Sequence, residues 1–173
     1  MSREKSEKNF FIFFHKNLDK IGIWVYNKGT KVKEMQPMKK TYYFDMDGVL
    51  ANFHKEPYKY ENATSRTWIA NLDPFTANIA IVRELIATGH DVYILSKAAN
   101  EDAKMGKIDW LAKYIPEMAV EKIIVLIGNG KKVDYIRTAT GVLVDDDMRN
   151  IRPWAKAGYE YIHLEVKGMT ITL

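Results

Sequence analysis

Short apolar runs alternate with helix-like segments from residue 41 onward, and this alternation constrains the fold more than any other feature of the chain. Five runs predict strands, at 41–45, 91–96, 122–128, 141–147 and 159–165. The inner runs are apolar almost throughout, which is typical of strands that are buried on both faces. The sequence therefore predicts an α/β fold with a doubly wound parallel sheet that is covered by helices on both sides.

Three segments between these runs predict helices, at 73–90, 100–116 and 150–158. In the first, Ile79, Val82 and Ile86 recur at helical spacing. Asn100 and Asn150 are the expected N-caps of the other two, because an Asn side chain accepts hydrogen bonds from the free amide groups of a first turn.

The composition limits the class of protein. A chain of 173 residues, 47% of them hydrophobic, is large enough for one domain with a substantial core. The absence of cysteine excludes disulfides and thiolate metal sites. No apolar run approaches the length of about 20 residues that spans a bilayer, and no signal-peptide pattern is present. We therefore expect a soluble, cytoplasmic protein without a membrane partner.

The net charge of +4 is concentrated at one end of the chain. Residues 1–40 carry 10 basic and 4 acidic side chains, whereas the remainder carries 16 basic and 18 acidic ones. We therefore predict an N-terminal extension of unknown role at 1–37, followed by one domain at 38–173. Nucleic-acid binding would depend on this extension alone, and we expect it to be a solvated basic arm.

Polar residues gather where three of the predicted strands end. Asp45 and Asp47 follow the first strand, Ser96 and Lys97 the second, and Asp145, Asp146 and Asp147 the fourth. Because parallel strands end at the same edge of a sheet, we expect these side chains to lie close together. Five carboxylates with few basic neighbours repel one another, and a divalent cation relieves that repulsion. Mg²⁺ prefers carboxylate and phosphate oxygens, so the sequence predicts a Mg²⁺ site that handles phosphate.

The spacing of Asp45 and Asp47 suits two different tasks. Side chains two residues apart, where a strand breaks into a turn, can point toward one centre. One carboxylate can attack phosphorus, while the other transfers a proton to the leaving oxygen and later takes one from water. Gly48 permits a positive φ or a close approach to a ligand. The alternatives are an ordinary turn or a calcium loop, although Leu50 and Phe53 do not fit an EF-hand loop.

These residues resemble the motifs of the haloacid dehalogenase-like (HAD) phosphatase superfamily. "FDMDGVL" resembles its first motif, Ser96 its second and Asp145-Asp146 its fourth. Within the superfamily, the chain is most similar to the 5′(3′)-deoxyribonucleotidases, through "KIDWLAKY" at 107–114 and "VLVDD" at 142–146. The likeness extends from about residue 39 to 164.

The resemblance implies a role for each motif residue. Asp45 would be the nucleophile and Asp47 the general acid and base, and Ser96 and Lys107 would hold the phosphoryl oxygens. The implied Mg²⁺ ligands are Asp45, the backbone carbonyl of Asp47, Asp145 and, close by, Asp146. The implied function is a Mg²⁺-dependent phosphomonoesterase that acts on (deoxy)nucleoside monophosphates through an aspartyl-phosphate intermediate.

The chain departs from the family pattern at three positions. Lys97 stands where Ser often follows the second-motif residue; it is either a further phosphate contact or an exposed lysine. Asp147 stands where Arg commonly follows the paired aspartates, and Arg149 is close enough in sequence to compensate. The pair Lys131-Lys132 competes with Lys107 as the third-motif lysine, and the match to K-x-x-W favours Lys107.

The segment from about 51 to 73 is the only stretch with room for a small cap over the site. Trp68, within it, and Phe75, just after it, are candidates for stacking on a nucleobase, although both could equally pack the cap onto the core. Two other functions stay open: a phosphatase for a sugar phosphate or another small phosphomonoester, and a nucleic-acid-associated protein. A homodimer also stays open.

Overall fold

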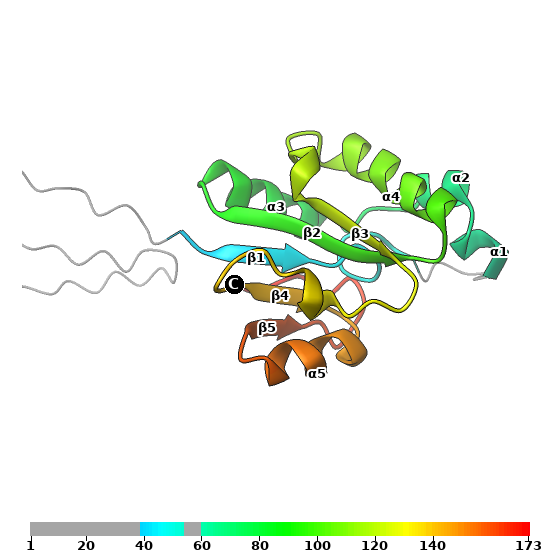
Figure 1. The fold of residues 1–173 in the computed structure, drawn as a ribbon. Helices are drawn as coiled ribbons and strands as arrows, with labels where there is room; N and C mark the ends of the chain where they lie inside the picture. Colours follow the sequence, from blue (N-terminus) through cyan, green and yellow to red (C-terminus); the bar gives the residue numbers. More distant parts are fainter. Residues whose placement is uncertain (1–38, 54–59) are drawn as a thin grey trace, which may run out of the picture. The chain divides into compact units, whose positions relative to one another are not determined.

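The computed structural model describes residues 39–53 and 60–173. The predicted extension at 1–37 and part of the predicted cap lie outside the described residues, so both assignments remain predictions. Residues Lys40–Leu173 form one compact unit (Figure 1). Among the residues that the structure describes, no helix combines the length and apolarity needed to cross a membrane.

One parallel sheet organises the described part of the chain. Its five strands are β1 (Thr41–Phe44), β2 (Asp91–Ala98), β3 (Ile123–Ile127), β4 (Val142–Asp145) and β5 (Glu160–His163). They lie in the order β3-β2-β1-β4-β5, and every neighbouring pair is parallel. The predicted α/β fold with a doubly wound parallel sheet is confirmed. Because β1 lies between β2 and β4, the three strands that carry the polar motifs are adjacent.

Helices cover both faces of this sheet. The described residues form the helices α1 (Tyr60–Ala63), α2 (Arg66–Ala70), α3 (Thr76–Ala87), α4 (Glu101–Tyr114) and α5 (Met148–Lys156), with 3₁₀ turns η1 (Val120–Lys122) and η2 (Lys132–Tyr135). Figure 1 shows α3 and α4 on one side of the sheet and α5 on the other. The helices that follow β1 and β2 therefore cover one face and the helix that follows β4 covers the other, so the side changes once, where the strand order reverses at β1.

Neighbouring residues of β1 enter two separate hydrophobic clusters. Tyr42 and Phe44 pack with the apolar side chains of α3 and α4. Tyr43, between them, packs in a second cluster with Trp154 of α5. Successive side chains of a strand point to opposite faces, so a continuous apolar run fills two cores at once. This explains why the inner strands lack polar alternation.

One of the two expected helix caps is confirmed, and the other is wrong. Asn100 caps α4, and its side chain accepts a hydrogen bond from the backbone N–H of Ala103 at 2.7 Å. The expectation of Asn150 as the cap of α5 is wrong, because Asp147 caps that helix and accepts from the N–H of Arg149. Asn150 lies within the first turn and donates instead to Asp145. Because Asp147 caps the helix, the side chain of Asn150 is available to bond Asp145 at the end of β4.

The insert after β1 packs against α4 through its second helix. Gly106 of α4 makes the close approach possible, since a Cβ there would lie 2.6 Å from the carbonyl oxygen of Arg66. The Arg66 side chain also forms an ion pair with Asp109, with Nε and Oδ2 2.6 Å apart. In Figure 1, α1 and α2 lie at the end of the molecule toward which the β1 arrow points. The insert is therefore placed beside the carboxyl ends of the strands.

Candidate active site

A tight loop follows β1 and carries both aspartates of the first motif. The carbonyl of Met46 accepts hydrogen bonds from the N–H groups of Leu50 and Ala51, each at 2.8 Å. Gly48 adopts a φ of +75°, and a Cβ at this position would lie 2.6 Å from Cγ of Asp146. Both the backbone conformation and the close approach require glycine here. The chain thereby brings the loop after β1 into contact with the loop after β4.

Asp45 is buried at the end of β1 and is held as a carboxylate. Its Oδ1 accepts from the backbone N–H of Met46 at 2.8 Å and lies 2.9 Å from Nζ of Lys132. Burial opposes ionisation, but the positive charges of Lys132 and Lys107 outweigh it and lower the pKa of Asp45. Ser96 adds a hydrogen bond that favours the same state. Asp45 is thus fixed in place and negatively charged.

Asp47 has the opposite electrostatic balance. Burial raises the pKa of this carboxyl, and the nearby charge of Asp45 adds to the effect against the attraction of Lys107. Its Oδ2 lies 2.6 Å from Nζ of Lys107. Its Oδ1 is buried and, within the described structure, has no hydrogen-bond partner. A buried oxygen without a partner is costly unless a ligand supplies one, so Asp47 is prepared for a partner that donates or accepts a proton.

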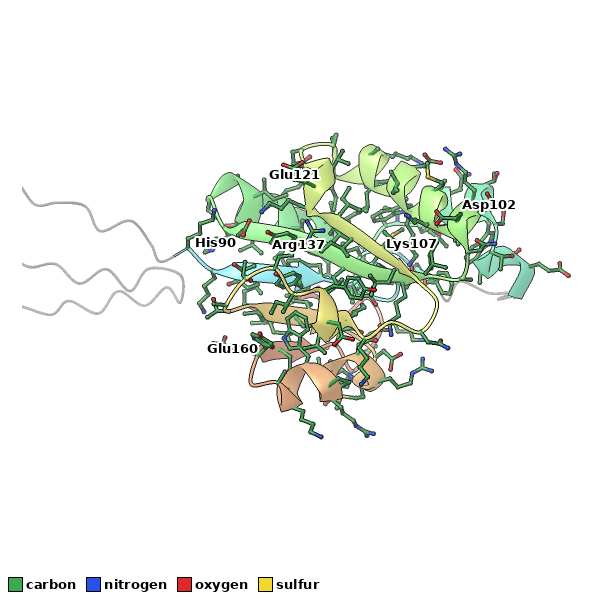
Figure 2. All side chains as sticks on the ribbon, in the orientation of Figure 1. His90, Asp102, Lys107, Glu121, Arg137 and Glu160 are labelled. Carbon is green, nitrogen blue, oxygen red and sulfur yellow. The ribbon has the colours of Figure 1, made fainter. Side chains whose placement is uncertain are left out.

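Ser96 and Lys107 meet at the edge of the same site. Ser96 is fully buried and lies within β2, which continues two residues further than the sequence predicted. Nζ of Lys107, from α4, donates to Oγ of Ser96 at 2.9 Å. Lys107 is only 1% exposed although its side chain is charged. Figure 2 shows Lys107 toward the carboxyl end of the sheet and His90 at the opposite end, remote from the site.

Lys132 is a second buried lysine of the site. Its Nζ lies 2.9 Å from Oδ1 of Asp45 and 2.7 Å from Oδ2 of Asp145, so it bridges β1 and β4. Burial lowers its pKa, but the two carboxylates outweigh burial and the net shift is upward. Its neighbour Lys131 is exposed. The sequence presented Lys107 and the Lys131-Lys132 pair as alternatives, whereas the structure brings Lys107 and Lys132 into one site.

Three carboxylates form a cluster beside this bridge. Oxygens of Asp45, Asp145 and Asp146 all lie within 4.8 Å of one another. Burial raises the pKa of Asp145, and the charge of Asp45 adds to the effect. Burial, followed by the charges of Asp45 and Asp145, raises the pKa of Asp146 to about 6. Asn150 supports the cluster by donating to Oδ1 of Asp145 at 3.2 Å.

This carboxylate cluster fits a divalent cation. Burial, and then the repulsion between the carboxylates, raises the pKa values of Asp145 and Asp146 although nearby lysines act in the opposite direction. A hard cation with oxygen ligands would relieve this repulsion. The carboxylate of Asp47 is not a member of the cluster. The role of its backbone carbonyl as a Mg²⁺ ligand remains a prediction.

The remaining predicted contacts are Trp68, Phe75 and Lys97. Trp68 packs edge-on against Phe53, with ring centroids 5.5 Å apart, and Nζ of Lys107 lies 5.9 Å from the Phe53 ring centre. Phe75 packs against the backbone of Gly168, where a Cβ would come within 2.6 Å of its ring. Lys97 is half-buried. The Phe53–Trp68 pair is therefore the aromatic surface next to the charged residues.

The side chain of Asp147 pairs with Arg149 and is not a member of the carboxylate cluster. It forms an ion pair with Arg149, in which Nη2 and Oδ2 lie 2.6 Å apart. The hydrogen bond from Arg149 lowers the pKa of Asp147, and the charge of Lys97 contributes to the same effect. The acidic residue that stands in the place of the family's Arg is thus neutralised locally and does not add a charge to the cluster.

Comparisons with known proteins support the fold. No protein-family model and no curated protein matches the chain. A chain of the Pnkp1/Rnl/Hen1 RNA repair complex is similar over 82% of this chain and 48% of its own length, with 16% identity and a TM-score of 0.56. A second structure of that complex is 16% identical, and the similarity covers 82% of this chain and 56% of the other, with a TM-score of 0.53. The HAD domain of the Legionella pneumophila effector Lem4 is 14% identical, and the similarity covers 76% of this chain and 88% of that domain, with a TM-score of 0.47.

These similarities concern the architecture alone. The chain spans about half the length of the two repair-complex chains that it matches. The two repair-complex structures agree with the doubly wound sheet.

Proposed function

We propose that the protein is a Mg²⁺-dependent phosphomonoesterase. The observation that carries the proposal is the pairing of each first-motif aspartate with its own buried lysine. Lys132 contacts Asp45 and Lys107 contacts Asp47, beside a cluster of three carboxylates. Two buried ammonium groups and a divalent cation would together offset the carboxylates and a phosphate dianion, which is the main requirement of phosphoryl transfer.

The pKa shifts of the two aspartates match two successive roles. Asp45, with its lowered pKa, would attack phosphorus as a carboxylate, and the bond from phosphorus to the ester oxygen would break. Asp47, with its raised pKa, would give its proton to the departing oxygen. Asp47 would then take a proton from a water that attacks the phosphorus of the acyl phosphate. Inorganic phosphate leaves and the Asp45 carboxylate is restored.

The other residues of the site hold the reacting groups. Ser96 and Lys107, already hydrogen-bonded to each other, would donate to the phosphoryl oxygens. Asp45, Asp145 and Asp146 would hold Mg²⁺, which supplies charge neutralisation at the phosphate when bound. Lys132 would keep Asp45 aligned, because it fixes Oδ1 and leaves Oδ2 outside that contact.

The proposed substrate is a (deoxy)nucleoside monophosphate. Two features support this choice: the resemblance of residues 107–114 to the deoxyribonucleotidase pattern, and the Phe53–Trp68 pair near Lys107. Aromatic faces stack on any nucleobase, so they favour a nucleotide without selecting a base.

A phosphate-release screen tests the proposal. The full chain with Mg²⁺ should hydrolyse nucleoside monophosphates, and Asp45→Asn should lower turnover by at least about 10³-fold. Glu160→Gln, exposed on β5 (Figure 2), is the matched control and should keep wild-type turnover. A wild-type protein that is inert toward every phosphomonoester would refute the activity. Turnover confined to sugar phosphates would overturn the substrate class alone.

A further inference from the structure

The segment after β5 returns to the loop that carries Asp47. It leaves the sheet at Leu164, whose N–H donates to the carbonyl of Asp145 at 3.0 Å. Four residues later, the N–H of Gly168 donates to the carbonyl of Gly48 at 2.9 Å. We call residues 164–171 the C-terminal strap. It connects the end of β4 with the loop after β1, the two segments that supply the carboxylates of the site.

Asn78 ties this strap to the same loop. It lies on α3, and its side chain is fully buried. Its Nδ2 donates to the carbonyl of Val49 at 2.7 Å and to that of Met169 at 3.0 Å. Its Oδ1 accepts from the N–H of Ile171 at 3.0 Å. One amide group thus joins a core helix, the loop after β1 and the strap, and it uses both of its N–H groups and its carbonyl oxygen.

The strap is built into the fold at both ends. Leu164 and Ile171 are buried in the main hydrophobic cluster. Gly168 has a φ of +72°, and a Cβ there would lie 2.6 Å from Cζ of Phe75. The N–H of Phe75 in turn donates to the carbonyl of Leu50, in the same loop, at 2.8 Å. The strap is therefore a packed element whose backbone fits one position against the loop.

These contacts hold the residues immediately after Asp47. The strap binds the carbonyl of Gly48 and Asn78 binds the carbonyl of Val49, so two successive peptide groups are fixed from outside the loop. The direct side-chain contacts of Asp45, in contrast, come from Met46, Lys132 and Ser96, none of which belongs to the strap or to α3. Loss of the Asn78 contacts should therefore displace Asp47 more than Asp45.

We propose that Asn78 is a positioning residue for Asp47, and that the C-terminal strap acts with it to fix the loop after β1. This inference rests on the proposed phosphatase function. Asn78 itself touches no reacting atom. Its effect is to hold the proton-transferring carboxyl at its working distance, where an error of about 1 Å can cost roughly 10²-fold in rate.

The test is Asn78→Asp in the full chain, because this change keeps the shape of the side chain and removes both donated hydrogen bonds. The matched control is Leu85→Ala, a core substitution on the same helix outside the network. With p-nitrophenyl phosphate and Mg²⁺, below both melting temperatures, Asn78→Asp should lower kcat by about 10- to 100-fold with little change in KM. Leu85→Ala should change kcat by less than about twofold, because a loss of stability does not lower turnover at a temperature where the variant remains folded.

A second readout does not depend on activity. Hydrogen exchange of the Leu50 and Ala51 amides, which close the loop on Met46, should accelerate in Asn78→Asp and not in Leu85→Ala. If Asn78→Asp does not fold, Asn78→Ser, which is neutral and keeps one donor, takes its place with the same expectations.

Equal kcat values in Asn78→Asp and Leu85→Ala would overturn the positioning role. If the wild type hydrolyses no phosphomonoester, the proposed function fails, and the exchange experiment alone decides the role of Asn78. Unchanged exchange of Leu50 and Ala51 would then refute it.

Discussion

Asp45 and Asp47 are two residues apart on one loop, yet their surroundings shift their pKa values in opposite directions. Burial disfavours the charged form of both. Asp45 faces two lysines and is ionised more readily, while Asp47 has an oxygen without a partner and holds a proton more strongly. Such a separation of pKa values is how one site provides both a nucleophile and an acid.

Asp146 should destabilise the metal-free protein at neutral pH. Its pKa in the folded protein is about 6, above the ordinary aspartate value of 3.8, chiefly because the carboxyl is buried. A carboxyl with a raised folded pKa favours folding only while it is protonated, so its contribution is lost as the pH rises from about 4 to about 6. In EDTA at pH 7.5, Asp146→Asn should therefore melt a few degrees above the wild type, and the difference should vanish at pH 4.

Thermal denaturation across this pH range checks the sign. Asp147→Asn is the matched control with the opposite expectation, because the hydrogen bond from Arg149 lowers the pKa of Asp147. It should melt slightly below the wild type at pH 7.5. An Asp146→Asn variant that melts lower than the wild type at neutral pH without metal would contradict the charge imbalance described for the carboxylate cluster.

At the scale of elements, Gly106 fixes how closely the insert approaches α4. A Cβ there would meet the backbone of Arg66, which cannot move without α2. Gly106→Ala should therefore lower the free energy of unfolding by about 1–3 kcal/mol, although Ala is a better helix former than Gly. Because Lys107 is the next residue, turnover should fall as well.

Urea denaturation and steady-state kinetics measure the two effects of Gly106→Ala. The control is Lys104→Ala, at a partly exposed position of the same helix, which should change stability by less than about 0.5 kcal/mol. If Gly106→Ala stabilised the protein as its helix propensity alone predicts, the close approach of α2 and α4 would be wrong.

The elements themselves were largely predictable from local patterns. Apolar runs predicted the five strands, and Asn100 marked the start of α4 correctly. The start of α5 was missed because Asp147 was assigned to the polar strand end, although an Asp is an equally good cap. The burial of Lys132 in place of Lys131 was not predictable, since only the 3₁₀ turn decides which of two adjacent lysines faces inward.

At the scale of the whole molecule, the candidate site unites segments from both halves of the sheet. The carboxylates come from the ends of β1 and β4, while the lysines come from α4 and η2. Parallel topology made the meeting of Asp45, Ser96 and Asp145 predictable. The proposed roles of Asn78 and the C-terminal strap were not predictable from the sequence. Their contacts are made to backbone groups, which almost every residue type carries, so no side-chain pattern marks them.

Mg²⁺ should stabilise the folded chain, because the unfolded chain does not bring the three carboxylates together. At a concentration of about 100 Kd, a ligand that binds only the native state adds about 2.7 kcal/mol. The melting temperature should rise with Mg²⁺ and reach a plateau. Asp145→Asn should abolish most of this rise, whereas Asp91→Asn, at the opposite end of the sheet, should keep it. A wild-type melting temperature that is independent of Mg²⁺ would contradict the proposed metal site.

The bridge that Lys132 makes between Asp45 and Asp145 has a consequence for folding. Through Lys132, the bridge joins Asp45 and Asp145, which are 100 positions apart in the sequence. Contacts at such separation form only after the loop-closure entropy has been paid, so they belong to the slow steps of folding. A chain with all its helices formed and β1 not yet paired with β4 would have neither the bridge nor the carboxylate cluster. Regain of activity after dilution from denaturant should thus lag behind the recovery of helical signal.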